Sequence, residues 1–226
     1  ARDWYPEDMR VREYIFDTWK KVVKSYGYER YDAPLLEPVE VYAAKSGQEL
    51  VNEQTYQFTD RGDRHVAIRP EMTPSVSRMI AARRQETPLP ARWYSIAQFM
   101  RYERPQRGRE REFWQLNVDM FGGEGAVAEA EIISLGVAIM KQFGATDDMY
   151  IVRVNNRKVI NYMMAHYLGL DADQSQAMVK LFDRKNKIST DSFRNQAAEI
   201  IGDDAKAGLQ KIAQLLAAKT MADLPE

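Results

Sequence analysis

The hydrophobic pattern between residues 91 and 121 predicts two strands joined by a charged loop. The outgoing strand, from Arg92 to Glu103, alternates with a period of two, and so does the return strand, from Phe113 to Phe121. On one face the return strand is apolar; its other face carries Phe113, Gln115, Asn117 and Asp119. Lysine and glutamate would be more typical of a solvated face. Since an ordinary surface strand also alternates, the pattern leaves a pocket wall and a solvated face both open.

The loop between these strands, Arg104 to Glu110, contains residues that interrupt regular structure. Pro105 and Gly108 disfavour a continuous strand, and three arginines make the loop positively charged. The sequence therefore predicts a flexible, cationic loop at the tip of the hairpin.

The first part of the chain predicts a helix followed by an extended segment. Pro6 suits a first helical turn, and Gly27 is a natural stop. An apolar stripe of helical spacing, expected to pack in the core, contains Val11, Ile15, Trp19, Val22 and Tyr26. Residues 28–38 are extended, and Pro34 cannot donate to a strand ladder. The pattern leaves an edge strand and a protein interface both open.

A hairpin is predicted next, with strands Thr55–Asp60 and Arg64–Arg69 around the turn sequence Arg61-Gly62-Asp63. An amphipathic helix to about Arg84 follows.

At the start of this helix, Thr73 is a plausible N-cap and Pro74 suits the first helical position. Glu71 lies at the junction between strand and helix, where side chains commonly meet ligands. A capping or solvated role also accounts for Glu71, so its function stays open on position alone.

The remaining pattern divides the chain into an α+β part and a helical part. Residues 123–143 predict a helix, and residues 149–154 predict a buried strand. From Asn155 onward only helical patterns occur, at about 158–168, 171–183, 191–201 and 204–218. We therefore expect an α+β domain at 1–154 and a helical segment at 155–226.

Composition excludes several classes of protein. The formal net charge of -1 argues against binding to nucleic acid or membranes by bulk charge, and the absence of cysteine excludes disulfides and thiolate sites. No apolar run reaches the roughly 18 residues of a membrane helix, so we expect a cytoplasmic protein. The two histidines, His65 and His166, lack companions with ligand-like spacing. The common nucleophile and glycine-rich phosphate motifs are also missing.

The residues that remain suit phosphoryl chemistry without a protein nucleophile. Arg101 at a strand end and Arg109 in the loop are able to neutralise phosphate charge, while Phe113 offers a flat apolar surface. Glu71 and Asp119 would form an anionic wall for an ammonium group. A solvated hairpin with scattered charges fits the same spacing, in which case each exposed ion pair contributes only about 0–1 kcal/mol.

Several stretches resemble histidyl-tRNA synthetase, a class II aminoacyl-tRNA synthetase. They are ARDWYPEDMR, YGYERYDAPLLEP, RPEMT and, above all, FMRYERPQRGREREFWQLNVDMFG. The resemblance is strong over residues 1–154, and beyond them only LFDRKNKI is similar to the helical insertion of the family. It implies a six- or seven-stranded antiparallel sheet flanked by helices, with motifs 1 and 2 present. It also implies a homodimer through residues 28–38 and the N-terminal helix.

The implied reaction joins histidine to ATP, releasing pyrophosphate, and then passes the histidyl group from the adenylate to tRNA(His). By matched position, Arg101 would hold the α-phosphate and the histidine carboxylate. Glu103 would lie near the adenine amino group, Arg109 would reach the outer phosphates, and Phe113 would stack on adenine. The histidine-binding residues would be Glu71, Met72, Thr73, Arg101, Gln115 and Asp119. Mg²⁺ would arrive with ATP, and no protein metal site is expected.

Two departures from the family pattern matter. Many bacterial members have glutamate where this chain has Asp119, so we expect the same role in a slightly deeper pocket. The family's Arg-Gly-Leu-Asp-Tyr-Tyr signature, its motif 3 arginine and its anticodon-binding domain do not occur in this sequence. We therefore expect an incomplete active site, with weak ligand binding and little or no turnover by the chain alone.

Two alternative functions remain. One is the regulatory subunit of ATP phosphoribosyltransferase, a synthetase-like protein that senses histidine; the intact cationic loop argues against it. The other is a nucleic-acid-binding module that uses that loop, which the overall charge and the few interleaved aromatic residues disfavour.

Overall fold

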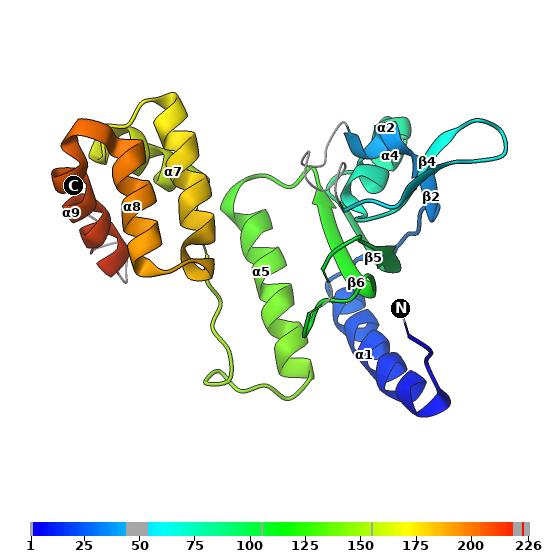
Figure 1. The fold of residues 1–226 in the computed structure, drawn as a ribbon. Coiled ribbons are helices and arrows are strands. Elements are labelled where there is room, and N and C mark those ends of the chain that lie inside the picture. Colours follow the sequence, from blue (N-terminus) through cyan, green and yellow to red (C-terminus); the bar gives the residue numbers. More distant parts are fainter. Residues whose placement is uncertain (1, 44–53, 105, 155, 219–222, 224–226) are drawn as a thin grey trace. The chain divides into compact units, whose positions relative to one another are not determined.

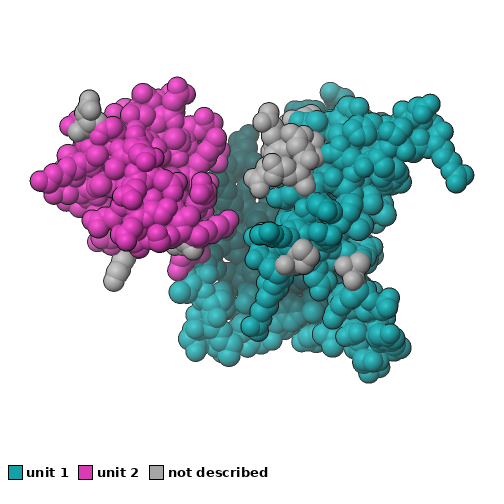
Figure 2. Space-filling view, viewed as in Figure 1, with its two compact units in different colours: residues 1–152 teal, residues 153–226 magenta. Residues whose placement is uncertain are grey.

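The computed structural model describes residues 2–43, 54–104, 106–154, 156–218 and 223. They form two compact units, residues 1–152 and residues 153–226 (Figures 1 and 2). Pro105 and Asn155, named in the predictions above, lie outside the described residues.

Unit 1 mixes short strands with helices. Its elements are α1 Pro6–Ser25, β1 Glu29–Arg30, β2 Leu36–Pro38, α2 Val39–Ala43, β3 Gln57–Thr59, β4 His65–Ile68, α4 Thr73–Ala82, β5 Ala91–Met100, β6 Glu112–Phe121 and α5 Gly125–Gln142. This confirms the α+β class, the predicted hairpins and the helices at both ends of the unit. The first hairpin is closed by Asp60, whose carboxylate accepts hydrogen bonds from the backbone N–H groups of Gly62 and Arg64 at 2.8 and 3.0 Å.

The described strands form two three-stranded sheets, in the orders β1-β5-β6 and β2-β4-β3. In the first, β1 runs parallel to β5, while β5 and β6 are antiparallel; the second is antiparallel throughout. The expected single sheet of six or seven strands is therefore not present among the described residues. One reason is local: the chain leaves β5 after Arg30 and joins β4 at Leu36, and Pro34 in this crossing has no N–H for a ladder. Of the two alternatives left open for residues 28–38, the structure shows an edge position for the strands there, because β1 and β2 each lie at the edge of a sheet. The interface stays a prediction.

Helices cover one face of the β5–β6 hairpin. In Figure 1, α1 and α5 lie side by side along this face, and their apolar residues pack with the apolar face of β6. The buried centre of this cluster consists of Val22, Val23, Tyr28, Tyr94, Ile96 and Leu135. The prediction that Val11 packs in this core is wrong, because its side chain is 60% exposed. Tyr14, one turn further along α1, is equally exposed.

The opposite face of the hairpin carries the predicted polar set and packs on α4. Met72, Val76, Ala97 and Phe99 form the buried cluster between them, together with Tyr31. The start of α4 differs from the prediction by one residue. Thr73 is already helical and Met72 occupies the N-cap position, so Pro74 falls in the second helical position and Thr73 makes no capping hydrogen bond.

The prediction of a buried strand at residues 149–154 is wrong. The segment has no strand structure, and Met149, Ile151 and Val154 are each at least 67% exposed. A strand needs a neighbour to pair its backbone groups, and no described strand of unit 1 lies beside this segment.

Unit 2 is helical, as predicted. Its elements are α6 Arg157–Tyr162, a π-helix at Met163–Tyr167, α7 Ala172–Arg184, a 3₁₀ turn at Lys185–Lys187, α8 Thr190–Ile201, a second 3₁₀ turn at Gly202–Asp204 and α9 Ala205–Ala217. Side-chain caps start three of the helices: Asn156 accepts from the N–H of Lys158, Asp171 from that of Gln174, and Ser189 from that of Ser192. The unit buries its own core of Met164, Leu168, Leu170, Met178, Leu181, Phe193, Ala197 and Ile212.

Candidate functional site

The β5–β6 register determines which side chains share the polar face. The cross-strand pairs on this face are Phe99–Phe113, Ala97–Gln115, Ser95–Asn117 and Trp93–Asp119. Ser95 and Ala97 are small and fully buried, so the polar side chains of β6 face a strand that leaves room above them. The Oδ1 atom of Asn117 is buried and has no hydrogen-bond partner in the described part of the chain. These features favour a pocket wall around Asn117, whereas Gln115 on the same face is exposed.

Asp119 lies on this face near the end of β6, opposite the start of β5, and a tyrosine holds its side chain. The Tyr31 hydroxyl donates a hydrogen bond to Asp119 Oδ2 at 3.1 Å. Burial raises the pKa of the Asp119 carboxyl, and the hydrogen bond from Tyr31 acts in the opposite direction. The pKa of Tyr31 is itself raised, first by burial and then by the negative charge of Asp119. A partly buried carboxylate of this kind is a typical binding group for a cationic or N–H-donating ligand.

Arg101 lies at the other end of the face, next to the charged loop and one residue beyond β5. Its Nε donates to the carbonyl oxygen of Pro70 at 2.9 Å, and its guanidinium lies 5.3 Å from the centre of the Phe113 ring. The backbone N–H of Arg101 also bonds to the carbonyl oxygen of Arg111 at 2.8 Å. Arg101 is thereby fixed by both the return strand and the segment that leads into α4.

Glu103 connects Arg101 to the loop. Its carboxylate is 3.9 Å from Arg101 Nη1 and 3.4 Å from Arg109 Nη1. The loop breaks the strands as predicted, and Gln106 and Arg109 exchange backbone hydrogen bonds at its tip. A cavity of about 270 Å³ opens beside it, lined by Gln54, Tyr102, Glu103, Arg104, Gln106 and Arg109. The Arg109 side chain is 56% exposed, so its guanidinium is accessible to an anion in this cavity.

The junction before α4 brings the third group of predicted residues close to Arg101. Pro70 accepts the hydrogen bond from Arg101, and Glu71, partly buried, follows it in the chain. Thr73 is exposed at the first position of α4. The Met72 side chain, in contrast, is fully buried beneath the face against Phe99 and Ala97, so it supports the face from below.

Two residues of this region were missed by the sequence analysis. One is Tyr31, whose partner Asp119 lies 88 positions away in the chain. The other is Arg69, a buried arginine that bonds to Asp32 Oδ1 at 3.0 Å and to the carbonyl oxygens of Ala33 and Gln98 at 2.7 and 2.9 Å. Residue spacing carries no signal for either contact. The position of Arg69 directly before Pro70, at the end of a predicted strand, was the one feature of the sequence that set this arginine apart.

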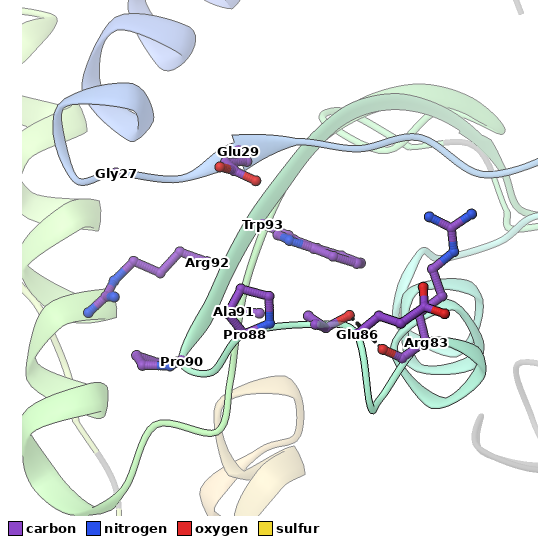
Figure 3. A pocket seen from close by; sticks show the side chains of 10 residues that line it. Gly27, Glu29, Arg83, Glu86, Pro88, Pro90, Ala91, Arg92 and Trp93 are labelled. Atoms are coloured by element: carbon purple, nitrogen blue, oxygen red, sulfur yellow. Dashed lines mark hydrogen bonds between the residues drawn. The ribbon is translucent and has the colours of Figure 1, made fainter.

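A larger cavity, of about 370 Å³, lies at the start of β5 and contains none of the predicted site residues. Figure 3 shows the Trp93 ring pointing into it, beneath Glu29 of β1, while Arg92 points to the other side of the strand. Arg92 is engaged there by Glu131 of α5 at 2.7 Å. The cavity borders the polar face through Trp93, the cross-strand neighbour of Asp119.

Neither a protein-built metal centre nor a membrane helix is found. No group of three or more histidine, cysteine, aspartate or glutamate residues is placed to hold a metal ion within the described ranges. Among the described helices, none is both long and apolar enough to cross a membrane.

Comparison with solved structures identifies the fold. The crystal structure of histidyl-tRNA synthetase from Nostoc sp. PCC 7120 matches with a TM-score of 0.80 at 20% identity, over 99% of this chain and 49% of that one. A Bacillus halodurans protein described as an ATP phosphoribosyltransferase regulatory subunit/histidyl-tRNA synthetase matches with a TM-score of 0.59 at 19% identity, over 92% of this chain and 64% of that one. At these identities the likeness shows the shared fold, that of a histidyl-tRNA synthetase.

Sequence comparison then gives the family. The family model described as histidyl-tRNA synthetase matches residues 1–224. A histidine--tRNA ligase from Leptospira biflexa is 47% identical over 92% of this chain and 47% of its own length. The chain belongs to the histidyl-tRNA synthetase family. It spans about half the length of the curated relatives it matches.

Proposed function

We propose that this chain carries the histidine- and ATP-binding face of a histidine--tRNA ligase. The reaction would begin with attack of the histidine carboxylate on the α-phosphorus of ATP, which forms histidyl-adenylate and releases pyrophosphate. The histidyl group would then pass to the 3′ end of tRNA(His), releasing AMP. The single observation that carries the proposal is the position of Arg101, fixed between the polar face of β6 and the residues that precede α4.

The ATP side would lie at the end of the face next to the charged loop. Arg101 would neutralise the α-phosphate and the attacking carboxylate as charge spreads in the transition state. Phe113 would stack on adenine, with Glu103 near the adenine amino group. Arg109 would bind the outer phosphates, and its exposure beside the 270 Å³ cavity supports this role. The guanidinium pair fits a polyphosphate because arginine binds phosphate oxygens through two N–H groups at once.

The histidine side would lie further along β6. Asp119 and Glu71 would bind the ammonium group or the ring, Gln115 and Thr73 would add hydrogen bonds, and Met72 would contribute through the junction that it supports. Mg²⁺ would be brought by ATP and would neutralise phosphate charge. ATP itself would supply the oxygen ligands that Mg²⁺ prefers.

We further propose that unit 1 is an incomplete class II catalytic core with motifs 1 and 2, and that unit 2 is the helical insertion. The chain spans about half the length of its relatives, so we expect little turnover from these residues alone. We place the protein in the cytoplasm, where it would meet tRNA. A homodimer through residues 28–38 and α1 is supported by exposed apolar side chains on both: Leu35 and Leu36 are 46% exposed, and Val11 and Tyr14 are 60% exposed.

Histidine-dependent exchange of pyrophosphate into ATP tests the proposal directly. It should be measured on this chain and on the protein encoded by the complete reading frame that contains it. We expect exchange in the complete protein that depends on histidine and on Arg101. Exchange that does not require histidine, or that persists in Arg101→Ala, would contradict the proposal.

The second candidate function is a histidine-sensing regulatory subunit of ATP phosphoribosyltransferase. The observation in its favour is the structural likeness to the Bacillus halodurans protein. The exposed arginine of the loop, paired with Glu103, argues for ATP instead, because a histidine sensor has no need of it. Saturable histidine binding without exchange in the complete protein would favour the sensor.

A further inference from the structure

The contact between Tyr31 and Asp119 joins the segment proposed to form the dimer interface to the face proposed to bind histidine. Tyr31 lies in the segment proposed as the dimer interface, whereas Asp119 lies on the proposed histidine-binding face. The phenolic oxygen and Asp119 Oδ2 are 3.1 Å apart, and Tyr31 is 8% exposed. Within the described chain, Tyr31 is the hydrogen-bond donor that reaches the Asp119 carboxylate.

The position of Tyr31 is fixed by the backbone and by its ring. Its N–H donates to the carbonyl oxygen of Tyr94 at 2.9 Å, which continues the β1–β5 pairing by one residue. Its ring packs on Trp93 with the ring centres 5.8 Å apart. Because Trp93 and Asp119 are cross-strand neighbours, this packing aims the hydroxyl at the carboxylate. The tyrosine is therefore held rigidly, and a phenylalanine would keep the same packing.

The hydrogen bond makes the two oxygens of the Asp119 carboxylate different in their available acceptor capacity. Oδ2 accepts from Tyr31, which leaves Oδ1 as the acceptor for a ligand. The next inward-facing residue of β6, Asn117, also has a buried oxygen without a partner in the described chain. Two acceptor oxygens on one strand, the first oriented by a fixed donor, match a ligand with more than one N–H group.

We propose that Tyr31 is a positioning residue for histidine: it orients the Asp119 carboxylate so that Oδ1 receives an N–H group of the amino acid. This inference rests on the proposed function and adds a residue to it. An aspartate is shorter than a glutamate by one methylene group, so its carboxylate stays close to β6, where the Tyr31 hydroxyl reaches it. Tyr31 acts through Asp119 and does not itself touch the reacting atoms.

The electrostatic surroundings make the role measurable. The Tyr31 hydrogen bond holds down a carboxyl pKa that burial raises, so its loss should raise the pKa of Asp119 further. Other charged groups near the pair are Asp32, which follows Tyr31 and is bonded to Arg69, and the Tyr28–Glu131–Arg92 cluster on the other face of the sheet. None of these is changed by replacing Tyr31 with phenylalanine.

The chain offers a matched control. Tyr28 also donates to a carboxylate, Glu131 Oε1 at 3.0 Å, and is 3% exposed, but it lies on the α5-covered face of the same sheet. Tyr28→Phe removes the same kind of hydrogen bond from a carboxylate outside the proposed site. A loss that comes merely from weakening the sheet should appear in both variants.

The experiment is steady-state pyrophosphate exchange by the complete protein and by its Tyr31→Phe and Tyr28→Phe variants, across pH. For Tyr31→Phe we expect the KM for histidine to rise about tenfold, the KM for ATP to stay unchanged, and the acid limb of kcat/KM for histidine to move to higher pH. Titration of histidine itself is common to all three proteins and cancels in the comparison.

The outcomes separate the inference from the proposed function. Equal behaviour of Tyr31→Phe and Tyr28→Phe, or a Tyr31→Phe profile that keeps the wild-type acid limb, would overturn the positioning role while leaving the ligase assignment in place. Absence of histidine-dependent exchange in the wild-type protein would overturn both. A combined Tyr31→Phe and Asp119→Asn variant should be no worse than Asp119→Asn alone, since both changes remove one interaction.

Discussion

The Nε atom of Arg101 donates a hydrogen bond to the carbonyl oxygen of Pro70 at a distance of 2.9 Å. This bond joins the end of β5 to the segment that leads into α4, and both stretches carry predicted ligand-binding residues. The others on the polar face, Phe113, Gln115 and Asp119, lie on β6. The guanidinium also lies over Phe113, so its orientation is fixed from two directions. A fixed cation needs little reorganisation when charge develops on a ligand, which is the condition for strong electrostatic stabilisation.

Arg101→Ala should abolish adenylate formation without unfolding the protein. Arginine is only part-buried here, and loss of one preorganised charge at a reacting phosphate typically costs about 10²–10³ in rate. Arg101→Lys should recover little, because lysine has no planar fork to satisfy Pro70 and a phosphate together. The measurement is pyrophosphate exchange, with circular dichroism to verify folding. Arg107→Ala, at an exposed arginine of the same loop, is the control, and an equal loss there would assign the effect to general charge.

Glu103→Gln should raise the KM for ATP more than the KM for histidine. The carboxylate lies within 4 Å of both Arg101 and Arg109, so it couples the loop arginine to the strand arginine. Without its charge the exposed Arg109 side chain loses its anchor, and we expect a change of about two- to fivefold, as for a partly exposed ion pair. Glu110→Gln is the control, since this glutamate is exposed in the same loop. Identical kinetic effects of the two variants would contradict the coupling.

Asp119→Asn should stabilise the fold while weakening histidine binding. The pKa of Asp119 in the folded protein is raised, chiefly by burial, so between its unfolded and folded values the native state binds more protons. Stability conferred by the protonated form is therefore lost as pH rises through this window. Asparagine avoids that loss, so the variant should be the more stable protein at neutral pH, with the difference vanishing in acid. Urea unfolding at several pH values measures this, and histidine and ATP affinities should show that only the former falls strongly.

Glu131→Gln should behave in the opposite way and provides the comparison. Hydrogen bonding to Arg92 is the main cause that lowers the pKa of Glu131, so its ionised form stabilises the fold. That contribution is present above the unfolded pKa and is lost as pH falls through the folded pKa. The variant should therefore be less stable than wild type at neutral pH and similar to it in acid. The same sign of change for Glu131→Gln and Asp119→Asn would show that the environments of the two carboxylates have been misassigned.

Arg69→Met should destabilise unit 1 by about 2–4 kcal/mol. The substitution removes a buried guanidinium, and the carbonyl oxygens of Ala33 and Gln98 then lose their hydrogen-bond donor. Chemical denaturation gives this free energy of unfolding. Arg64→Met removes an ion pair of similar length whose arginine side chain is 79% exposed, and it should cost less than about 1 kcal/mol. Comparable losses for the two variants would contradict a special role for Arg69 between the 32–35 segment and β5.

Much of the local structure followed from the sequence by itself. The alternation of β5 and β6 determines which residues share a face, and the register of the hairpin confirms that division from Phe99–Phe113 to Trp93–Asp119. The helices of unit 2 and the turn at Asp60 follow equally from periodicity and turn chemistry. These features depend on residues close together in the chain, so their pattern is visible without tertiary structure.

Other features depend on which segments meet, and there the sequence was insufficient. Residues 149–154 have the composition of a buried strand, yet they stay exposed because no described strand of unit 1 offers them backbone partners. Val11 belongs to an apolar stripe, yet its side chain is 60% exposed. Whether an apolar side chain is buried depends on which segments pack against it, and the sequence pattern does not show these.

The sequence by itself determined the chemical identities on the polar face of β6, because strand alternation places Gln115 and Asp119 together whatever packs against them. Only the tertiary structure decided how those groups are held. Tyr31 reaches Asp119 across 88 positions, and Arg101 meets Pro70 across 31. Such contacts arise from the parallel pairing of β1 with β5 and the packing of α4 on the hairpin, and a hydrogen bond across that separation leaves no periodic signal in the chain.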